Sequence, residues 1–298
     1  MRVLAAVLGR PIAHSLSPLL HRSAFAALQM DSSRYSRFDL GADELAAFLD
    51  AHPQHTGFSL TMPLKDRLVA LAGERGWMLE DTAELTGAAN TLVRTGQQVQ
   101  VANTDVRGIV RAIAPHLPAG TAAEGSGPAD ARATILGAGA TAASALVACR
   151  DLGIGHVDFL VRNPERARRV LALAERIGIT ASVAGFERIR QSLIIISTLP
   201  AEAGVAPVWD ESFTGGASEA VALDVAYAQD SAFLAAAAAR GLQPVDGTAM
   251  LVEQAVAQSE MFLSAAEAPV GLSGAELRET IAAAMYAALE HSGPASRD

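Results

Sequence analysis

The sequence predicts an α/β protein built on parallel sheets crossed by helices. Short β-branched runs alternate with longer stretches rich in Ala and Leu, which is the order expected when each strand is followed by a helix. The chain has 298 residues, 50% of them hydrophobic, so a sizeable core can form. Because single cores stop growing near ~250–300 residues, this length favours about two domains.

Residues 1–105 are predicted to form the first sheet-and-helix unit. A buried strand is expected at residues 3–8, and Ser17-Pro18 should open a helix to about residue 30, with the serine as its cap. Residues 115–131 are rich in Pro, Gly, Ala and Asp, which indicates an exposed loop before a second domain. The other predicted elements are strands at 35–39 and 57–61 and helices at 44–50, after Pro63 and at 105–114.

Residues 106–242 predict a Rossmann-type, doubly wound nucleotide-binding domain. From residue 243 the chain is predicted to be helical, with amphipathic stretches at 250–263 and 275–289. We expect residues 243–298 to complete the first domain, with a cleft between the two domains. Within the second domain, strands are expected at 132–136, 156–161, 193–197 and 221–225, and a helix at 141–152.

Bulk composition excludes several classes of function. The net charge of −9 and the pI of about 5.3 give no overall attraction to nucleic acid or to anionic lipid. No window reaches the ~18 consecutive apolar residues of a membrane span. We therefore expect a small-molecule substrate as the binding partner, and neither nucleic acid nor a membrane. The single cysteine, Cys149, favours a reducing compartment, so the cytoplasm is expected. His14, His21, His52 and His55 form no plausible metal set, because Pro53 breaks any helical register between the last pair.

A glycine-rich turn follows the first predicted strand of the second domain. Gly137-Ala138-Gly139-Ala140-Thr141-Ala142 matches the G-x-G-x-x-A pattern of dinucleotide-binding folds, where it joins a strand to a helix. Gly137 and Gly139 would permit a tight turn and the close approach of a pyrophosphate, whose charge the helix N–H groups satisfy.

The end of the next strand indicates which dinucleotide binds. An NAD site usually carries an acidic residue there, but this strand ends in Arg162-Asn163-Pro164-Glu165-Arg166. Arg162 and Arg166 could hold a 2′-phosphate by charge-assisted hydrogen bonds, which favours NADP. Arg168 and Arg169 are better explained as the solvated face of a helix.

The first domain contains groups suited to carbonyl reduction. Lys65 can give a proton to a developing alkoxide, and Asp105 can orient the lysine; with a nucleotide site these are the parts of a carbonyl reductase. Ser15 and Ser17 lie between a strand end and a helix N-terminus, where a carboxylate is well received. Alternatively, Ser17 only caps its helix, Asp105 caps the next one, and Lys65 is a solvated surface residue.

An ordered series of motifs runs over nearly the whole chain, at residues 11–18, 59–65, 87–91, 103–105, 197–200, 224–227 and 247–255. In this order and spacing the motifs resemble the shikimate dehydrogenase family. The first four are similar to the family's serine-x-serine loop, its N-V-T-x-P-x-K, its G-A-x-N-T and its N-T-D. The last three are similar to its cofactor-side loops and C-terminal helix. This resemblance implies the reversible reduction of 3-dehydroshikimate to shikimate by NADPH, in the chorismate pathway to aromatic amino acids.

The resemblance also implies residue roles. Lys65 and Asp105 would be the catalytic pair, and Ser15 and Ser17 would hold the substrate carboxylate. Met250 would pack on the nicotinamide, although it equally suits a helix core. Thr61, Asn90, Asp105, Tyr227 and Gln254 would line the substrate, and the cofactor would lie along Gly137, Ala138, Gly139, Ala140, Thr141, Arg162, Asn163, Arg166, Thr198 and Gly247.

Several positions depart from the family pattern. Ser59 stands where asparagine is usual, Ala102 replaces an aspartate, and Val106 follows Asp105 where glycine is expected. Tyr227 lacks its usual following proline. These changes leave ring-hydroxyl specificity open, so quinate or an amino analogue of shikimate is an alternative substrate. A catalytically idle sensor of nucleotide or of a shikimate-like acid is a further alternative, and a homodimer is compatible with the sequence.

Overall fold

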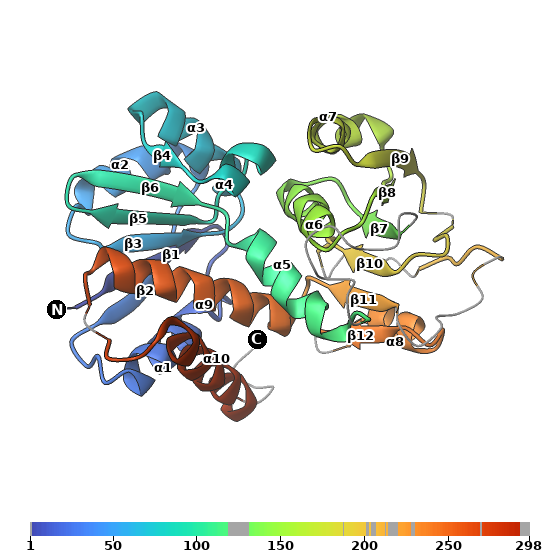
Figure 1. The fold of residues 1–298 in the computed structure, drawn as a ribbon. Helices are drawn as coiled ribbons and strands as arrows, with labels where there is room; N and C mark the ends of the chain where they lie inside the picture. Colours follow the sequence, from blue (N-terminus) through green and yellow to red (C-terminus); the bar gives the residue numbers. More distant parts are fainter. Residues whose placement is uncertain are drawn as a thin grey trace. The chain divides into compact units, whose positions relative to one another are not determined.

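The computed structural model divides the chain into two compact units (Figure 1). The first comprises Met1–Thr104 and Val252–Asp298, and the second Asp105–Leu251. Most of the predicted loop at 115–131 falls outside the residues that the structure describes. Those residues are 2–118, 131–186, 188–200, 203, 207–211, 213, 220–227, 230–268 and 270–292.

The first unit contains a mixed six-stranded sheet in the order β2-β1-β3-β5-β6-β4. β1 pairs in parallel with both β2 and β3, as the alternation of strands and helices predicts. The prediction did not include β5 and β6, which form an antiparallel hairpin on the edge of β3. The strands are β1 (Leu4–Gly9), β2 (Arg34–Asp39), β3 (Gly57–Leu60), β4 (Met78–Leu79), β5 (Thr91–Thr95) and β6 (Gln98–Ala102).

Helices of the first unit bury apolar side chains against this sheet. Leu8 of β1, Phe58 of β3, Leu68 of α3 and Leu92 of β5 belong to one buried cluster. In addition, α1 packs against α10. The helices are α1 (Ser17–Ala27), α2 (Leu45–Ala51), α3 (Lys65–Arg75), α4 (Asp81–Thr86), α10 (Gly274–His291) and the greater part of α9 (Gly247–Ala265).

The second unit has an all-parallel sheet in the order β12-β11-β10-β7-β8-β9. The strand order reverses at β7, which is the doubly wound topology of dinucleotide-binding folds and confirms the predicted fold class. Its elements are α5 (Asp105–Ile113), β7 (Arg132–Leu136), α6 (Ala140–Asp151), β8 (His156–Leu160), α7 (Arg168–Arg176), β9 (Thr180–Ala184), β10 (Ile194–Ser197), β11 (Val221–Asp224), α8 (Ala232–Ala238) and β12 (Gln243–Val245).

Two local predictions are wrong. Gln243–Val245, predicted as helical, form β12, because Val221–Leu223 of β11 offer them a parallel partner. Ser17 is not the cap of α1: Leu16 occupies the cap position and no side chain caps the helix, since Ser17 already lies in the first turn with its side chain buried.

Within the described part of the chain, no helix has the length and apolar character needed to cross a membrane.

Candidate active site

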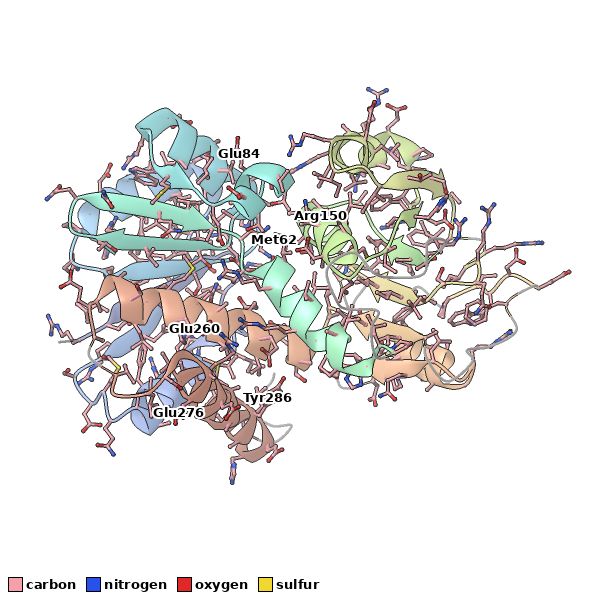
Figure 2. The ribbon with its side chains drawn as sticks, in the orientation of Figure 1. Met62, Glu84, Arg150, Glu260, Glu276 and Tyr286 are labelled. Atoms are coloured by element: carbon pink, nitrogen blue, oxygen red, sulfur yellow. The ribbon has the colours of Figure 1, made fainter. Side chains whose placement is uncertain are left out.

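The lysine-bearing segment follows directly from β3. The Thr61 N–H donates to the Leu8 carbonyl at 2.9 Å, and the Leu64 N–H donates to the Thr61 carbonyl at 2.8 Å. This turn leads into α3, whose first residue is Lys65. Lys65 and Thr61 are half-buried, whereas Met62 between them is exposed. Figure 2 labels Met62 in this turn. The turn therefore holds Lys65 at a defined place at the end of the sheet.

Lys65 is also the only lysine among the 23 Lys and Arg residues of the sequence. Everywhere else the chain carries its positive charge on arginine, whose guanidinium does not release a proton at neutral pH. The sole lysine side chain thus lies at the position that the sequence predicts for proton transfer.

Asn90 connects three segments of the first unit. Its Oδ1 accepts from the Thr91 hydroxyl at 2.8 Å and from the Thr104 N–H at 2.9 Å. Its Nδ2 donates to Thr104 Oγ1 at 3.0 Å and to Gln254 Oε1 at 3.4 Å. Next to it, the Ala89 N–H donates to the Lys65 carbonyl at 3.0 Å. The structure therefore brings together the segments of Lys65, Asn90 and Gln254.

The serine loop precedes α1. The Ser15 N–H donates to the Ile12 carbonyl at 3.1 Å, and the Ser17 N–H lies 3.4 Å from Ser15 Oγ. A pocket at Ser15 is also lined by His14, Leu19 and Arg37. The Arg37 guanidinium, which the sequence interpretation did not include, donates to the Ala13 carbonyl and so ties this loop to β2.

The glycine turn of the second unit has the conformation that its sequence predicts. Gly137 has φ of +108°, and a Cβ placed there would lie 2.5 Å from Thr198 Oγ1. The Thr198 hydroxyl in turn donates to the Leu136 carbonyl at 2.7 Å. Gly139 precedes the first residue of α6, Ala140, and a Cβ placed there would meet no atom of a described residue within 4 Å. The backbone at the start of α6 is thus open to an approaching group.

The residues after β8 have two kinds of role. Arg162 and Arg166 are exposed, as a phosphate ligand requires. Asn163 Oδ1 accepts from the Glu165 N–H at 3.0 Å and caps the turn Pro164–Ala167, which is a structural role. Arg168 forms an ion pair with Glu165, consistent with its interpretation as a surface residue.

The other predicted residues of the second unit lie at the ends of its elements. Asp105 is buried and begins α5, and Tyr227 is 42% exposed beyond the end of β11. A Cβ on Gly247 would lie 2.6 Å from the Asp224 carbonyl oxygen, so a glycine is needed where α9 begins. Met250 is buried, as expected for a core residue, and its contact with nicotinamide stays a prediction. Among the residues that the structure describes, no group of three or more His, Cys, Asp and Glu could hold a metal.

Comparisons with known proteins cover both units. Residues 7–92 match the family model described as the shikimate dehydrogenase substrate binding domain. A shikimate dehydrogenase (NADP(+)) of Methylibium petroleiphilum is 35% identical over 292 residues, covering 93% of this chain and 94% of the relative. The Mycobacterium tuberculosis shikimate dehydrogenase structure has 32% identity and a TM-score of 0.75, covering 96% and 99% of the two chains. A Thermus thermophilus shikimate 5-dehydrogenase in complex with NADP(H) and shikimate has 27% identity and a TM-score of 0.71, with the same coverage.

Proposed function

The chain belongs to the shikimate dehydrogenase family, and on that premise we propose that it reduces 3-dehydroshikimate reversibly to shikimate with NADPH, in aromatic amino-acid biosynthesis. The observation that carries this proposal is the 35% identity to a shikimate dehydrogenase (NADP(+)) over 93% of the chain. The similarity therefore extends over most of both units.

The second unit fits NADP. A Cβ on Gly139 would meet no described atom within 4 Å, so the backbone at the start of the 12-residue helix α6 is accessible to a pyrophosphate, which the helix dipole would stabilise. The exposed guanidinium groups of Arg162 and Arg166 suit the 2′-phosphate that distinguishes NADP from NAD. When bound, NADPH would supply the hydride.

Lys65 and Asp105 are proposed as the catalytic pair. Reduction of the ring ketone builds negative charge on its oxygen, and a nearby ammonium stabilises this charge and supplies the proton. We assign that part to Lys65, the sole lysine, at the start of α3. Asp105 is the first residue of α5 and is buried, and its carboxylate would orient the Lys65 ammonium.

The remaining polar groups are proposed to bind the substrate. Because the net charge is −9, local groups must hold the substrate carboxylate, and we assign this to Ser15 and Ser17. The 3.4 Å contact between Asn90 Nδ2 and Gln254 Oε1 supports a joint role for these two amides at the ring hydroxyls. Thr61 and Tyr227 would complete the binding site.

A spectrophotometric assay tests the proposed function. The protein is mixed with shikimate and NADP, and formation of NADPH is followed by its absorbance; parallel reactions replace NADP by NAD and shikimate by quinate. We expect turnover with shikimate and a preference for NADP. Turnover with quinate but not with shikimate would make quinate the substrate. Binding of shikimate without any turnover would instead support a sensor that has no catalytic activity.

A cytoplasmic location and a homodimer also stay proposals, tested by cell fractionation and by light scattering.

A further inference from the structure

A buried polar cluster in the first unit joins α1, β2, β3, β5 and α9. No member is more than 4% exposed, and every member has a hydrogen-bond partner within the cluster or in Asn90. Such a satisfied network is rigid, because each buried polar group would be costly to leave unpaired. The members are His21, Tyr35, Ser59, Thr91, Gln258 and Ser259.

Gln258 of α9 is at the centre of this cluster. Its Nε2 donates to the Asn90 carbonyl at 3.2 Å and to Thr91 Oγ1 at 3.1 Å. Its Oε1 accepts from the Ser59 hydroxyl at 2.7 Å and lies 3.4 Å from His21 Nε2. A glutamine amide has two N–H donors and one oxygen with two lone pairs, so these four contacts use its full capacity.

The direction of each hydrogen bond in the cluster follows from one fixed acceptor. A backbone carbonyl can only accept, so the Gln258 NH₂ faces Asn90 and the Gln258 oxygen faces Ser59 and His21. Ser59 then gives its proton to Gln258 and accepts from the Tyr35 hydroxyl at 2.7 Å. His21 carries its proton on Nε2 and accepts from the Ser259 hydroxyl on Nδ1 at 2.9 Å.

The donors of the cluster also fix the side chain of Asn90. Thr91 Oγ1 accepts from Gln258, so its own proton is directed to Asn90 Oδ1, at 2.8 Å. Gln258 therefore acts on Asn90 twice, directly at the carbonyl and through Thr91 at the side-chain amide. Gln258 also follows Gln254 by one turn of α9, so both lie on the same face of that helix.

We propose that Gln258 is a positioning residue of the substrate site, which sets the place and direction of the Asn90 amide without touching the substrate. This inference rests on the proposed function, because it concerns the ring hydroxyls that Asn90 is assigned to bind. The amide that orients Asn90 comes from α9, whereas Asn90 itself immediately precedes β5. Substrate affinity thereby depends on the packing of α9 against the sheet.

Gln258→Met tests the proposal, because methionine keeps the length of the side chain and removes the amide. KM for shikimate should rise about 5- to 30-fold, the factor expected for one to two kcal/mol. We expect a smaller change in kcat and an unchanged KM for NADP. Gln258→Glu, which retains an oxygen but loses the NH₂ donors, is the second variant should Gln258→Met fold poorly. An unchanged KM for shikimate in folded variants would overturn the proposal.

Ser259→Ala is the matched control. It removes an equally buried hydrogen bond from the next residue of α9, but that bond goes to His21 and not to Asn90. Its melting temperature should fall while its KM for shikimate stays that of the unsubstituted chain. A rise in KM equal to that of Gln258→Met would mean that any loss in this cluster weakens the site, and would overturn the specific role of Gln258.

A double-mutant cycle separates positioning from general stability. If Gln258 acts through Asn90, Gln258→Met should add little to the KM of Asn90→Ala. Additive effects in the cycle would overturn the inference. Failure of the proposed function has a different signature, since the unsubstituted chain would then form no NADPH from shikimate and NADP.

Discussion

The two units prepare their candidate sites in different ways. In the first unit, Asn90 is held by buried hydrogen bonds with Thr91, Thr104 and two glutamines of α9. In the second unit, the candidate nucleotide site consists of an open glycine turn and the exposed guanidinium groups of Arg162 and Arg166. The substrate side is preorganised by side chains, and the cofactor side by backbone shape and surface charge. Substitutions should therefore affect substrate binding and turnover in the first unit, and stability or affinity for the dinucleotide in the second.

The largest effect is expected at Lys65. Lys65→Ala should lower kcat by roughly 10²- to 10⁴-fold, because general acid catalysis is lost, while NADP affinity is retained. Lys65→Arg is the matched control: it keeps the charge but does not release a proton at neutral pH. Steady-state kinetics and nucleotide titration measure both variants. Full activity in Lys65→Arg would mean that charge alone suffices and that Lys65 is not the proton donor.

Gly137→Ala tests whether backbone shape governs the second unit. With φ of +108° and a Cβ only 2.5 Å from Thr198 Oγ1, the variant should lose about 3 kcal/mol of unfolding free energy, measured in urea. Gly139→Ala is the paired comparison, since its Cβ meets no described atom within 4 Å. It should keep its stability and lose NADP affinity. Equal stability of the two variants would contradict the geometry of the turn.

His21 should make the stability of the first unit depend on pH. Burial lowers the pKa of His21 to about 3, against the opposing hydrogen bond to Gln258. The unfolded chain therefore takes up a proton near pH 6.5 that the folded chain does not bind until about pH 3. Stability is fully present above pH 6.5 and is lost as the pH falls through this window.

Between pH 6.5 and pH 5, the contribution of His21 should decrease by about 2 kcal/mol. Urea unfolding at both pH values gives the free energy of unfolding of the unsubstituted chain and of His21→Gln. The difference between the two chains is the contribution of His21. His14→Gln, at an exposed histidine, should retain the full pH dependence. The same pH dependence in His21→Gln would exclude His21 as its origin.

The smallest effect is expected at the exposed cations. Arg162→Gln should weaken NADP binding about tenfold and leave NAD binding nearly unchanged, because only NADP carries the 2′-phosphate. Arg168→Gln is the control, since Arg168 is already paired with Glu165. Calorimetric titration of both variants with NADP and with NAD measures these affinities. A parallel loss of NAD affinity in Arg162→Gln would contradict the phosphate assignment.

Prediction from the sequence worked best where the signal is local. The strand at 132–136, the glycine turn and the start of α6 follow one another without a gap, and the structure confirms them. It failed for β5 and β6, which were not assigned, and for β12, which extends the sheet only because β11 is beside it. The roles of Lys65 and Asp105 stay predictions, although each lies at the first residue of a helix.

The sequence alone determined the features that depend on composition or on residues close together in the chain. These are the α/β alternation, the left-handed glycine of the nucleotide turn, and the single lysine among many arginines. Only the tertiary structure decided what surrounds Asn90. Ser59 and Gln258 are 199 positions apart, and no local period relates a serine on β3 to a glutamine on α9. Their meeting is a consequence of burial, which forces distant polar groups to satisfy one another once water has been excluded.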